Sequence, residues 1–304
     1  MLPFARVAII GMGLIGSSLA RAIRANMPTV KLVVTDADPG VRARVLALDL
    51  ADDVTDGAGA AVVDADLVLL AVPLSAFAGV MAEIAPELSA GTVISDVGSA
   101  KGVVLDVLAP LLPTGVHLVP AHPVAGTEKS GPDAGFATLF DGRWCILTPA
   151  PATDDAAVAG VTEFWTRLGS KVETMDARHH DLVLAVTSHI PHLIAYSIVG
   201  TAADLEGVTE GEVIKYSAGG FRDFTRIAAS DPTMWRDVFL YNRDAVLEVL
   251  ARVSEDLSAL QRAIRWGDGD TLHARFSQSR AIRQAIVEAG QDTAAPDFGR
   301  GAQE

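Results

Sequence analysis

The feature that most constrains the fold is a glycine-rich turn between an apolar run and a helix-like segment near the start of the chain. Residues 6–10 are rich in β-branched side chains, the motif G-M-G-L-I-G follows with Gly11, Gly13 and Gly16, and SSLARAIRAN continues with helical spacing. A lone G-x-G-x-x-G is weak evidence, since such turns are common. Here it follows a predicted strand and opens a predicted helix, and Asp36 lies 20 residues beyond Gly16, which together indicate a dinucleotide-binding turn.

Each position of this turn has a predicted role. Gly11 permits the tight turn, Gly13 lets a pyrophosphate approach the backbone, and Gly16 allows close packing of the helix, whose N-terminus supplies amide donors. Asp36 would accept hydrogen bonds from the ribose hydroxyls and repel a 2′-phosphate, and Asp38 adds a second negative charge. The sequence therefore predicts NAD, rather than NADP, as the cofactor.

Strand-like and helix-like segments alternate through the first half of the chain. Strands are predicted at residues 31–38, 65–73, 91–99, 117–123, 143–149 and 171–176, and helices at 17–26, 75–88, 101–112 and 157–169. This alternation predicts an α/β protein with a Rossmann-type, doubly wound parallel sheet. Beyond residue 177 the apolar residues have helical periodicity. We therefore expect a dinucleotide-binding domain at 1–176 and an all-helical substrate and dimerisation domain at 177–304, frayed from about 291.

The composition limits the partners. With 304 residues, 50% of them apolar, the chain should bury a large core, and a net charge of −14 argues against a face for nucleic acid. The single cysteine, Cys145, is expected to be a small buried hydrophobe rather than a catalytic thiol. The N-terminus superficially resembles a signal peptide, but three glycines interrupt its apolar core, and we find no run of about eighteen uncharged apolar residues. We expect a cytoplasmic protein with no membrane partner.

Three of the seven histidines stand in unusual settings: His122 in AHPVAGTEKSG, and His189 and His192 in TSHIPHLIAYS. Zinc is one alternative, but no acid or cysteine signature completes a site, so we expect no metal. A histidine near neutral pH suits the removal of a hydroxyl proton, and His122 follows a strand that would end on the cofactor side of the sheet. A hydrogen-bonded strand-end histidine is the other reading. Ser99 could share a bond with the same hydroxyl or could cap the helix near Lys101.

Several further motifs in order resemble the prephenate and arogenate dehydrogenase family of tyrosine biosynthesis. They are GMGLIGSSLARAI, AVPLSAF, ISDVGSAKG, HPVAGTEKSGPDAG with LFDGRWCILTP, TSHIPHLIAYSIV and AGGFRDFTRIAASDPTMWRDVFLYN. The resemblance runs from the glycine turn to about residue 250, and several independent motifs in the right order are specific where the first alone is not.

The resemblance implies roles for individual residues. The catalytic histidine that accepts the ring hydroxyl proton matches His122, its supporting serine matches Ser99, and the arginine that grips a substrate carboxylate matches Arg226. Arg222 is a second arginine of the same segment, for which a surface or interdomain ion pair is the alternative. Bidentate, permanently charged arginine suits a substrate with two carboxylates. The remaining substrate-site residues are Glu128 at the entrance, Thr127, His189 and His192, and the remaining cofactor-site residues are Leu14, Ile15, Val72 and Pro73.

By the same resemblance, NAD takes a hydride from the carbon that bears the hydroxyl while the ring carboxylate leaves as CO₂. Prephenate would give 4-hydroxyphenylpyruvate and arogenate would give tyrosine; an amino-substituted analogue is a third possible substrate. A homodimer through the helical domain is expected. Two alternatives stay open: another two-domain NAD-dependent oxidoreductase of the 3-hydroxyacid dehydrogenase or imine reductase type, and a non-catalytic NAD-sensing regulator. HPVAGTEKSG and DFTRIA argue against the first, and the presence of Ser99, His122 and Arg226 against the second.

Overall fold

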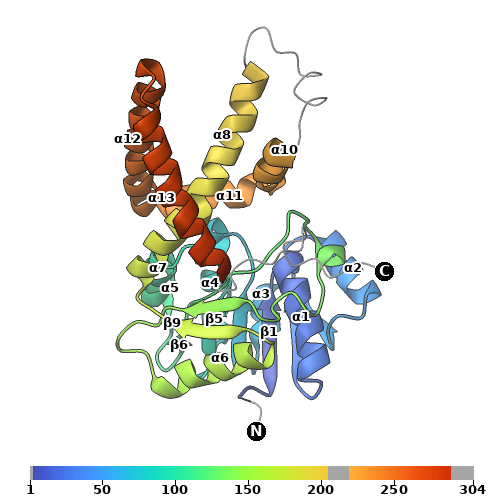
Figure 1. Cartoon of the computed structure of the whole chain (residues 1–304). Coiled ribbons are helices and arrows are strands. Elements are labelled where there is room, and N and C mark those ends of the chain that lie inside the picture. The colour runs from blue at the N-terminus through green and yellow to red at the C-terminus, as the bar shows by residue number, and fades with distance from the viewer. Residues whose placement is uncertain (1–2, 205–218, 289–304) are drawn as a thin grey trace. The chain divides into compact units, whose positions relative to one another are not determined.

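A six-stranded sheet lies at the centre of the N-terminal half in the computed structural model of the chain, which describes residues 3–204 and 219–288 (Figure 1). All its strands are parallel, in the order β3-β2-β1-β4-β5-β6. Their bounds are β1 (Arg6–Ile10), β2 (Lys31–Thr35), β3 (Asp53–Val54), β4 (Leu67–Leu70), β5 (Val93–Asp96) and β6 (His117–Leu118). The doubly wound sheet is confirmed, and its order reverses between β1 and β4, where such sheets bind ligands at the carboxyl ends of the strands.

Helices cover both faces of this sheet, which is why its strands are almost continuously apolar. One core cluster packs Leu19 and Ile23 of the helix after the glycine turn against Trp165, and the other packs Phe77 and Met81 on the opposite face. The helices and 3-10 turns are α1 (Leu14–Asn26), α2 (Pro39–Ala47), α3 (Ala58–Val62), η1 (Leu74–Ala76), α4 (Phe77–Ile84), η2 (Ala85–Glu87), α5 (Gly102–Leu108), η3 (Ala109–Leu111) and α6 (Asp155–Arg167).

The segment predicted as one strand at 117–123 forms two short strands, and each belongs to a different sheet. It breaks at Val119 and Pro120, between β6 and β7 (Ala121–Pro123), because a proline cannot donate the next ladder hydrogen bond. β7 pairs antiparallel with β8 (Trp144–Leu147), and β8 pairs parallel with β9 (Lys171–Thr174). The later predicted strands therefore exist, but they form a separate three-stranded sheet. The 3-10 turn η4 (Pro132–Ala134) lies in the β7–β8 connection.

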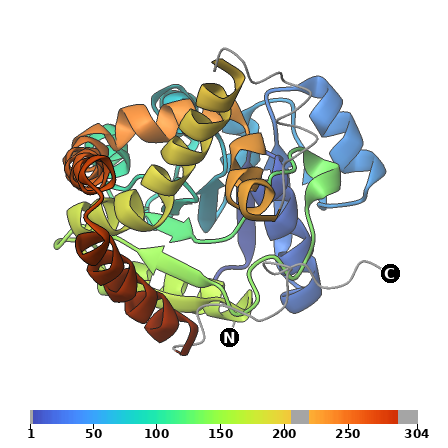
Figure 2. The same ribbon diagram turned by 45° about the horizontal axis from the view of Figure 1, so that its top comes forward.

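One continuous helix spans Ala177–Asp204 and comprises α7 (Ala177–Leu184), a π-helical turn η5 (Ala185–His189) and α8 (Ile190–Asp204) (Figure 2). Its best window has a mean hydropathy of 1.6, so by length and composition it could cross a membrane. The expectation that no segment reaches this limit is therefore wrong, because residues 182–203 contain no Asp, Glu, Lys or Arg. One such helix is weak evidence, because core helices of soluble proteins pass the same test; this helix buries His180, Asp181 and His189, and 28% of its apolar window is buried.

The other described helices follow after residue 218. They are α10 (Gly219–Thr225), η6 (Arg226–Ala229), α11 (Pro232–Tyr241), α12 (Arg243–Trp266) and α13 (Gly269–Glu288). Backbone contacts divide the chain into two compact units, residues 1–249 and 250–304. This division falls within α12, whereas the predicted domain boundary near residue 176 concerns the change from mixed to helical structure and stays a prediction. The predicted frayed tail lies outside the described residues.

Candidate active site

The glycine turn joins β1 to α1 with the geometry that its sequence predicts. Gly11 has a φ of +96°, and a Cβ there would lie 2.4 Å from the carbonyl oxygen of Ala71. A Cβ on Gly16 would lie 1.9 Å from the carbonyl oxygen of Gly11. Only glycine fits at these two positions. The same hypothetical Cβ on Gly11 would lie 2.8 Å from Val72 Cγ1, which places predicted cofactor residue Val72 beside the turn.

Gly13 differs from the other two glycines, because a Cβ there would meet nothing within 4 Å. It is the N-cap of α1 and no side chain caps this helix, so the amides of the half-buried Leu14 and Ile15 face a space that a phosphate could fill. The residues present therefore fit a dinucleotide pyrophosphate. Pro73, the remaining predicted cofactor residue, is exposed just after β4.

Asp36 lies against this turn. Its Oδ2 accepts a hydrogen bond from the Met12 amide at 2.7 Å and its Oδ1 accepts one from the Asp38 amide at 2.9 Å. The carboxylate is thereby fixed at the carboxyl end of β2, where an adenosine ribose is bound in folds of this kind.

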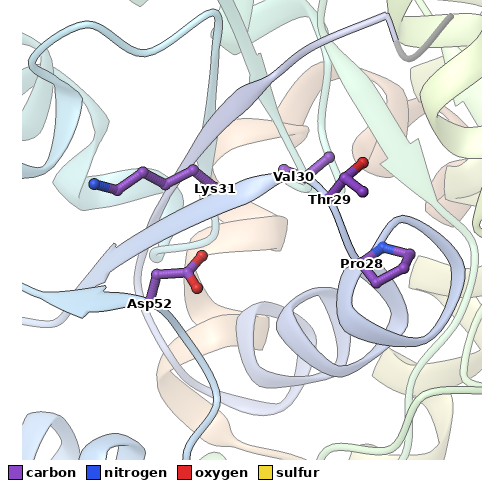
Figure 3. Close-up of a pocket in the computed structure, with 5 residues that line it drawn as sticks. All are labelled: Pro28, Thr29, Val30, Lys31 and Asp52. Atoms are coloured by element: carbon purple, nitrogen blue, oxygen red, sulfur yellow. The ribbon is translucent and has the colours of Figure 1, made fainter.

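A surface hollow elsewhere on the sheet is not this site. Its lining residues are Pro28, Thr29, Val30, Lys31 and Asp52 (Figure 3). Lys31 begins β2, so the hollow lies at the amino end of a strand whose carboxyl end carries Asp36. Ligands of parallel α/β sheets bind at the carboxyl ends, so we assign no function to this hollow.

His122 lies at the carboxyl end of β5. The backbone amide of Ala121 donates to Oδ1 of Asp96, the last residue of β5, at 3.2 Å. The His122 side chain is 7% exposed, and its Nδ1 is 2.8 Å from Nε2 of His180. Its Nε2 makes no hydrogen bond within residues 3–204 and 219–288. Burial first, and then electrostatic interactions with His180, Lys101 and His189, hold the pKa of His122 well below its ordinary value, so the imidazole is neutral at neutral pH.

A fully buried ion pair supports the strand that carries His122. Lys101 Nζ donates to Asp96 Oδ2 and, at 2.8 Å, to the carbonyl oxygen of Ala121. Both side chains of the pair are 0% exposed. The neighbouring amides of Gly98 and Ala121 donate to the same carboxylate, which compensates its removal from water.

Ser99 follows β5, and the supporting role that the resemblance implies for it stays a prediction. Its hydroxyl makes no hydrogen bond with His122 or with any other residue that the structure describes. The alternative, that Ser99 caps the helix near Lys101, is wrong, because Lys101 is the N-cap of α5. The amides of Lys101 and Gly102 are bound by the Asp181 carboxylate, at 2.7 and 2.8 Å, so this helix is capped from a distant segment.

Arg226 begins η6, and its Nη1 lies 3.7 Å from Glu128 Oε2. Both residues belong to the predicted substrate site, so the structure brings these two together. Their side chains are 42% and 24% exposed, respectively, which leaves the guanidinium accessible. The charge of Arg226 also acts on His192, whose pKa is lowered by burial first and by this charge in addition.

His192 and His189 both pack against Trp235. The His192 ring stacks on the indole at 3.6 Å between centroids, and its Nδ1 donates to the carbonyl oxygen of Ser188 at 2.8 Å. Asn242 Nδ2 donates to His189 Nδ1 at 3.0 Å, so the His189 proton is on Nε2. That Nε2 and the Trp235 Nε1 are buried donors without a hydrogen-bond partner in the described chain. Buried donors of this kind are uncommon and mark a place where a polar group is expected.

Two predicted substrate residues stand apart from these contacts. Arg222 is exposed on α10 and its Nε lies 3.4 Å from the exposed carboxylate of Asp223. Thr127 is exposed, and its Oγ1 accepts a hydrogen bond from the Lys129 amide at 3.2 Å. Neither contact points to a ligand.

Sequence motifs did not indicate His180, Asp181 or Lys101 as site residues. All three are buried and contact one another or the strand before His122. The signal that could have found the first two is a His-Asp pair directly before a long uncharged helical segment, since ionisable residues are seldom buried without a partner. Cys145 is buried as expected, and burial raises the pKa of its thiol well above the ordinary range. Across the described ranges, no group of three His, Cys, Asp or Glu side chains is arranged to hold a metal ion.

Comparisons with known proteins agree with this arrangement. Residues 19–174 match the nucleotide-binding domain of prephenate dehydrogenase, and residues 176–278 match the dimerization domain of the same family. The chain is 46% identical to cyclohexadienyl dehydrogenase of Zymomonas mobilis over 94% of this chain and 97% of that protein. It is 32% identical to prephenate dehydrogenase of Bacillus subtilis over 92% of this chain and 76% of that protein.

A solved structure is similar over the same length. Prephenate dehydrogenase from A. aeolicus, determined in complex with hydroxyphenyl propionate and NAD⁺, superposes with a TM-score of 0.85 at 32% identity. The match covers 94% of this chain and 98% of that one. Two family domains in sequence, relatives matched nearly end to end and a shared fold lead to one conclusion: the chain belongs to the prephenate dehydrogenase family.

Proposed function

We propose that this protein is an NAD-dependent cyclohexadienyl dehydrogenase that oxidises and decarboxylates prephenate or arogenate in tyrosine biosynthesis. The observation that carries the proposal is the His122 imidazole, which is buried, kept neutral and held at the carboxyl end of a nucleotide-binding sheet. A neutral imidazole at this place is suited to remove the proton of a substrate hydroxyl.

NAD, bound at the glycine turn, would accept the hydride from the carbon that carries the hydroxyl. His122 would take the hydroxyl proton on Nε2. The carbonyl that forms provides an acceptor for the electrons released as the ring carboxylate leaves as CO₂, and the ring becomes aromatic. Ser99 would assist by orienting the hydroxyl, a role that rests on the family resemblance alone.

Arg226 would hold a substrate carboxylate. Its guanidinium is accessible and faces Glu128, which would limit the approach of anions to one side of the arginine. The buried Nε2–H of His189 and Nε1–H of Trp235 would donate to the polar side chain of the same substrate. His192 connects this pair with Arg226, because it stacks on Trp235 and its pKa is lowered by burial and then by the charge of Arg226. Arg222 and Thr127 would lie at the rim of the site.

The experiment that tests the proposal is an NADH-formation assay with prephenate and arogenate side by side, each with NAD and with NADP. Turnover of at least one substrate with NAD is expected. A preference for NADP would contradict the assignment of Asp36 to the ribose, and no NADH with either substrate would refute the proposed activity.

We also propose that the protein is a cytoplasmic homodimer whose nucleotide-binding and helical domains meet near Asp176. The two family matches end and begin at residues 174 and 176, and the second is a dimerization domain. Apolar side chains on α8 and α11 are exposed, among them Val199 at 41% and Leu240 at 63%, and a partner subunit would cover them. Sedimentation analysis should give twice the chain mass; a monomer at micromolar concentration would contradict this assembly.

A further inference from the structure

A chain of hydrogen bonds begins at His122 and ends at a carboxylate on α7. His122 Nδ1 is 2.8 Å from His180 Nε2, and His180 Nδ1 is 2.9 Å from Asp181 Oδ1. The three residues are 7%, 0% and 8% exposed. In such a buried chain each nitrogen must be either a donor or an acceptor, so the protonation state of one end determines that of the other.

The carboxylate fixes the direction of these bonds. Burial disfavours ionised Asp181, but the hydrogen bonds from His180 and from the amides of Lys101 and Gly102 outweigh burial and lower the pKa of this carboxyl. An ionised carboxylate can only accept, so the proton of the His180 ring is on Nδ1. Burial also lowers the pKa of His180, which keeps this ring neutral and makes its Nε2 an acceptor. His122 Nδ1 must then be the donor.

We infer that Asp181 and His180 are positioning residues that hold His122 in the tautomer protonated on Nδ1, leaving the lone pair on Nε2. This inference deepens the proposed function and rests on it. The opposite tautomer would present an N–H to the substrate hydroxyl and could not take its proton. In the step itself the substrate O–H bond breaks and an Nε2–H bond forms on His122, while the Nδ1–H of the resulting imidazolium stays on His122 and continues to donate to His180 Nε2.

Backbone groups hold both ends of this chain of hydrogen bonds in place. Asp181 is fixed by the amides at the start of α5, and its own carbonyl oxygen accepts a hydrogen bond from Asn242 Nδ2 at 2.8 Å. At the other end, Ala121, which precedes His122, is held by Asp96 and Lys101. The chain of hydrogen bonds therefore joins the start of α5, helix α7 and strand β7, and its geometry depends on how these segments pack.

The tautomer can be measured without turnover. In protein labelled with ¹⁵N-histidine, the nitrogen shifts of His122, identified by their loss in His122→Asn, should show a protonated Nδ1 and an unprotonated Nε2 at neutral pH. A protonated Nε2 would overturn the inference whether or not the enzyme oxidises a cyclohexadienyl substrate. Absence of turnover together with the expected tautomer would reject only the proposed function.

A matched pair of variants tests the effect on catalysis. His180→Phe keeps a ring but removes the acceptor, whereas His180→Gln offers an amide oxygen to His122 and an amide N–H to Asp181. We expect His180→Phe to lower kcat by about 100-fold or more, the range of a lost general base, with little change in KM. His180→Gln should recover most of kcat. His179→Gln, which changes an exposed residue of the same helix, is the control and should behave as the wild type.

The pair separates positioning from packing. If His180 only filled space, the smaller, flexible Gln would harm the protein at least as much as Phe. Equal kcat values for the two variants, or a normal kcat in His180→Phe, would therefore overturn the inference. Should His180→Phe fail to fold, the tautomer measurement on the wild type still decides.

Discussion

Arg226 and Arg222 are four residues apart and face different surroundings. Arg226 lies by Glu128 and acts on His192, while Arg222 meets only the exposed Asp223 among its described contacts. The charge is the same in both, so the difference in surroundings must decide which of them holds a substrate anion. A substitution at each position can therefore separate binding from a general loss of positive charge.

Arg226→Ala should raise KM for the cyclohexadienyl substrate by roughly 10- to 100-fold, as expected for a lost charge-assisted hydrogen bond of about 1.5–3 kcal/mol. The kcat value should change much less, because the arginine binds substrate before and during the reaction. Steady-state kinetics measure both constants. Arg222→Ala is the matched control, and an equal rise of KM in the two variants would reject the special role of Arg226.

His122→Asn should lower kcat by about 10²- to 10⁴-fold, the usual contribution of a general base. Asparagine keeps a polar side chain of similar reach but cannot accept a proton at neutral pH. Because His122 lies on β7 rather than at the arginine, KM should stay near the wild-type value. Turnover close to wild type in this variant would end the assignment of the base.

At the scale of single elements, two glycines at the start of α1 have different roles: Gly13 leaves room for the pyrophosphate, and Gly16 allows close packing against Gly11. Gly13→Ala should leave the unfolding midpoint near that of the wild type, because its Cβ meets no protein atom, but should raise KM for NAD by occupying the approach of the pyrophosphate. Gly16→Ala should lower the unfolding midpoint, because its Cβ would overlap the carbonyl of Gly11. Thermal unfolding and NAD kinetics on both variants check this; the reverse pattern would contradict the role of Gly13.

The buried pair of Lys101 and Asp96 supports a second element, the strand before the base. Lys101→Met should reduce the free energy of unfolding by about 3–5 kcal/mol, because it leaves Asp96 charged, buried and without its cation. Urea unfolding provides the measurement. Arg44→Met, which removes an exposed partner of Asp133, is the control and should change stability little. An equal fall in the free energy of unfolding in both variants would show that the buried ion pair stabilises the protein no more than the exposed one does.

The sequence predicted the features that depend on neighbouring residues, but it did not predict the contacts between segments that are far apart in the chain. The glycine turn, Asp36 and the order of the sheet follow from motifs and periodicity within short windows. The break at Pro120 depends on which sheet each half of the run can join, and the cap of α5 comes from Asp181. Such contacts are set by packing, so neither His180 nor Asp181 stood out, and Ser99 was given a cap that a distant carboxylate provides.

At the scale of the whole molecule, neutral buried histidines make stability depend on pH. Burial lowers the pKa of His189 from the ordinary 6.5 to about 4 in the folded protein. Between these values only the unfolded chain binds the proton, so the free energy of unfolding should fall as the pH decreases from 6.5 towards 4, by up to about 3 kcal/mol for this residue. His122, His180 and His192 are shifted in the same direction.

Urea unfolding at intervals from pH 7.5 to about 4.5 measures this slope. His189→Leu should reduce the slope relative to wild type, even though it also removes the bond to Asn242. The exposed His179, changed to Gln, serves as the comparison. A slope unaffected by His189→Leu would show that this histidine is not protonated selectively in the unfolded chain.

The two contacts of the Asp181 carboxylate have a consequence for molecules that have not finished folding. One carboxylate finishes α5 and also orders the ring beside His122. A molecule in which α7 has not docked would lack both contacts, and we expect it to oxidise its substrate much more slowly. Completion of the native packing and the onset of chemistry would thus be a single event.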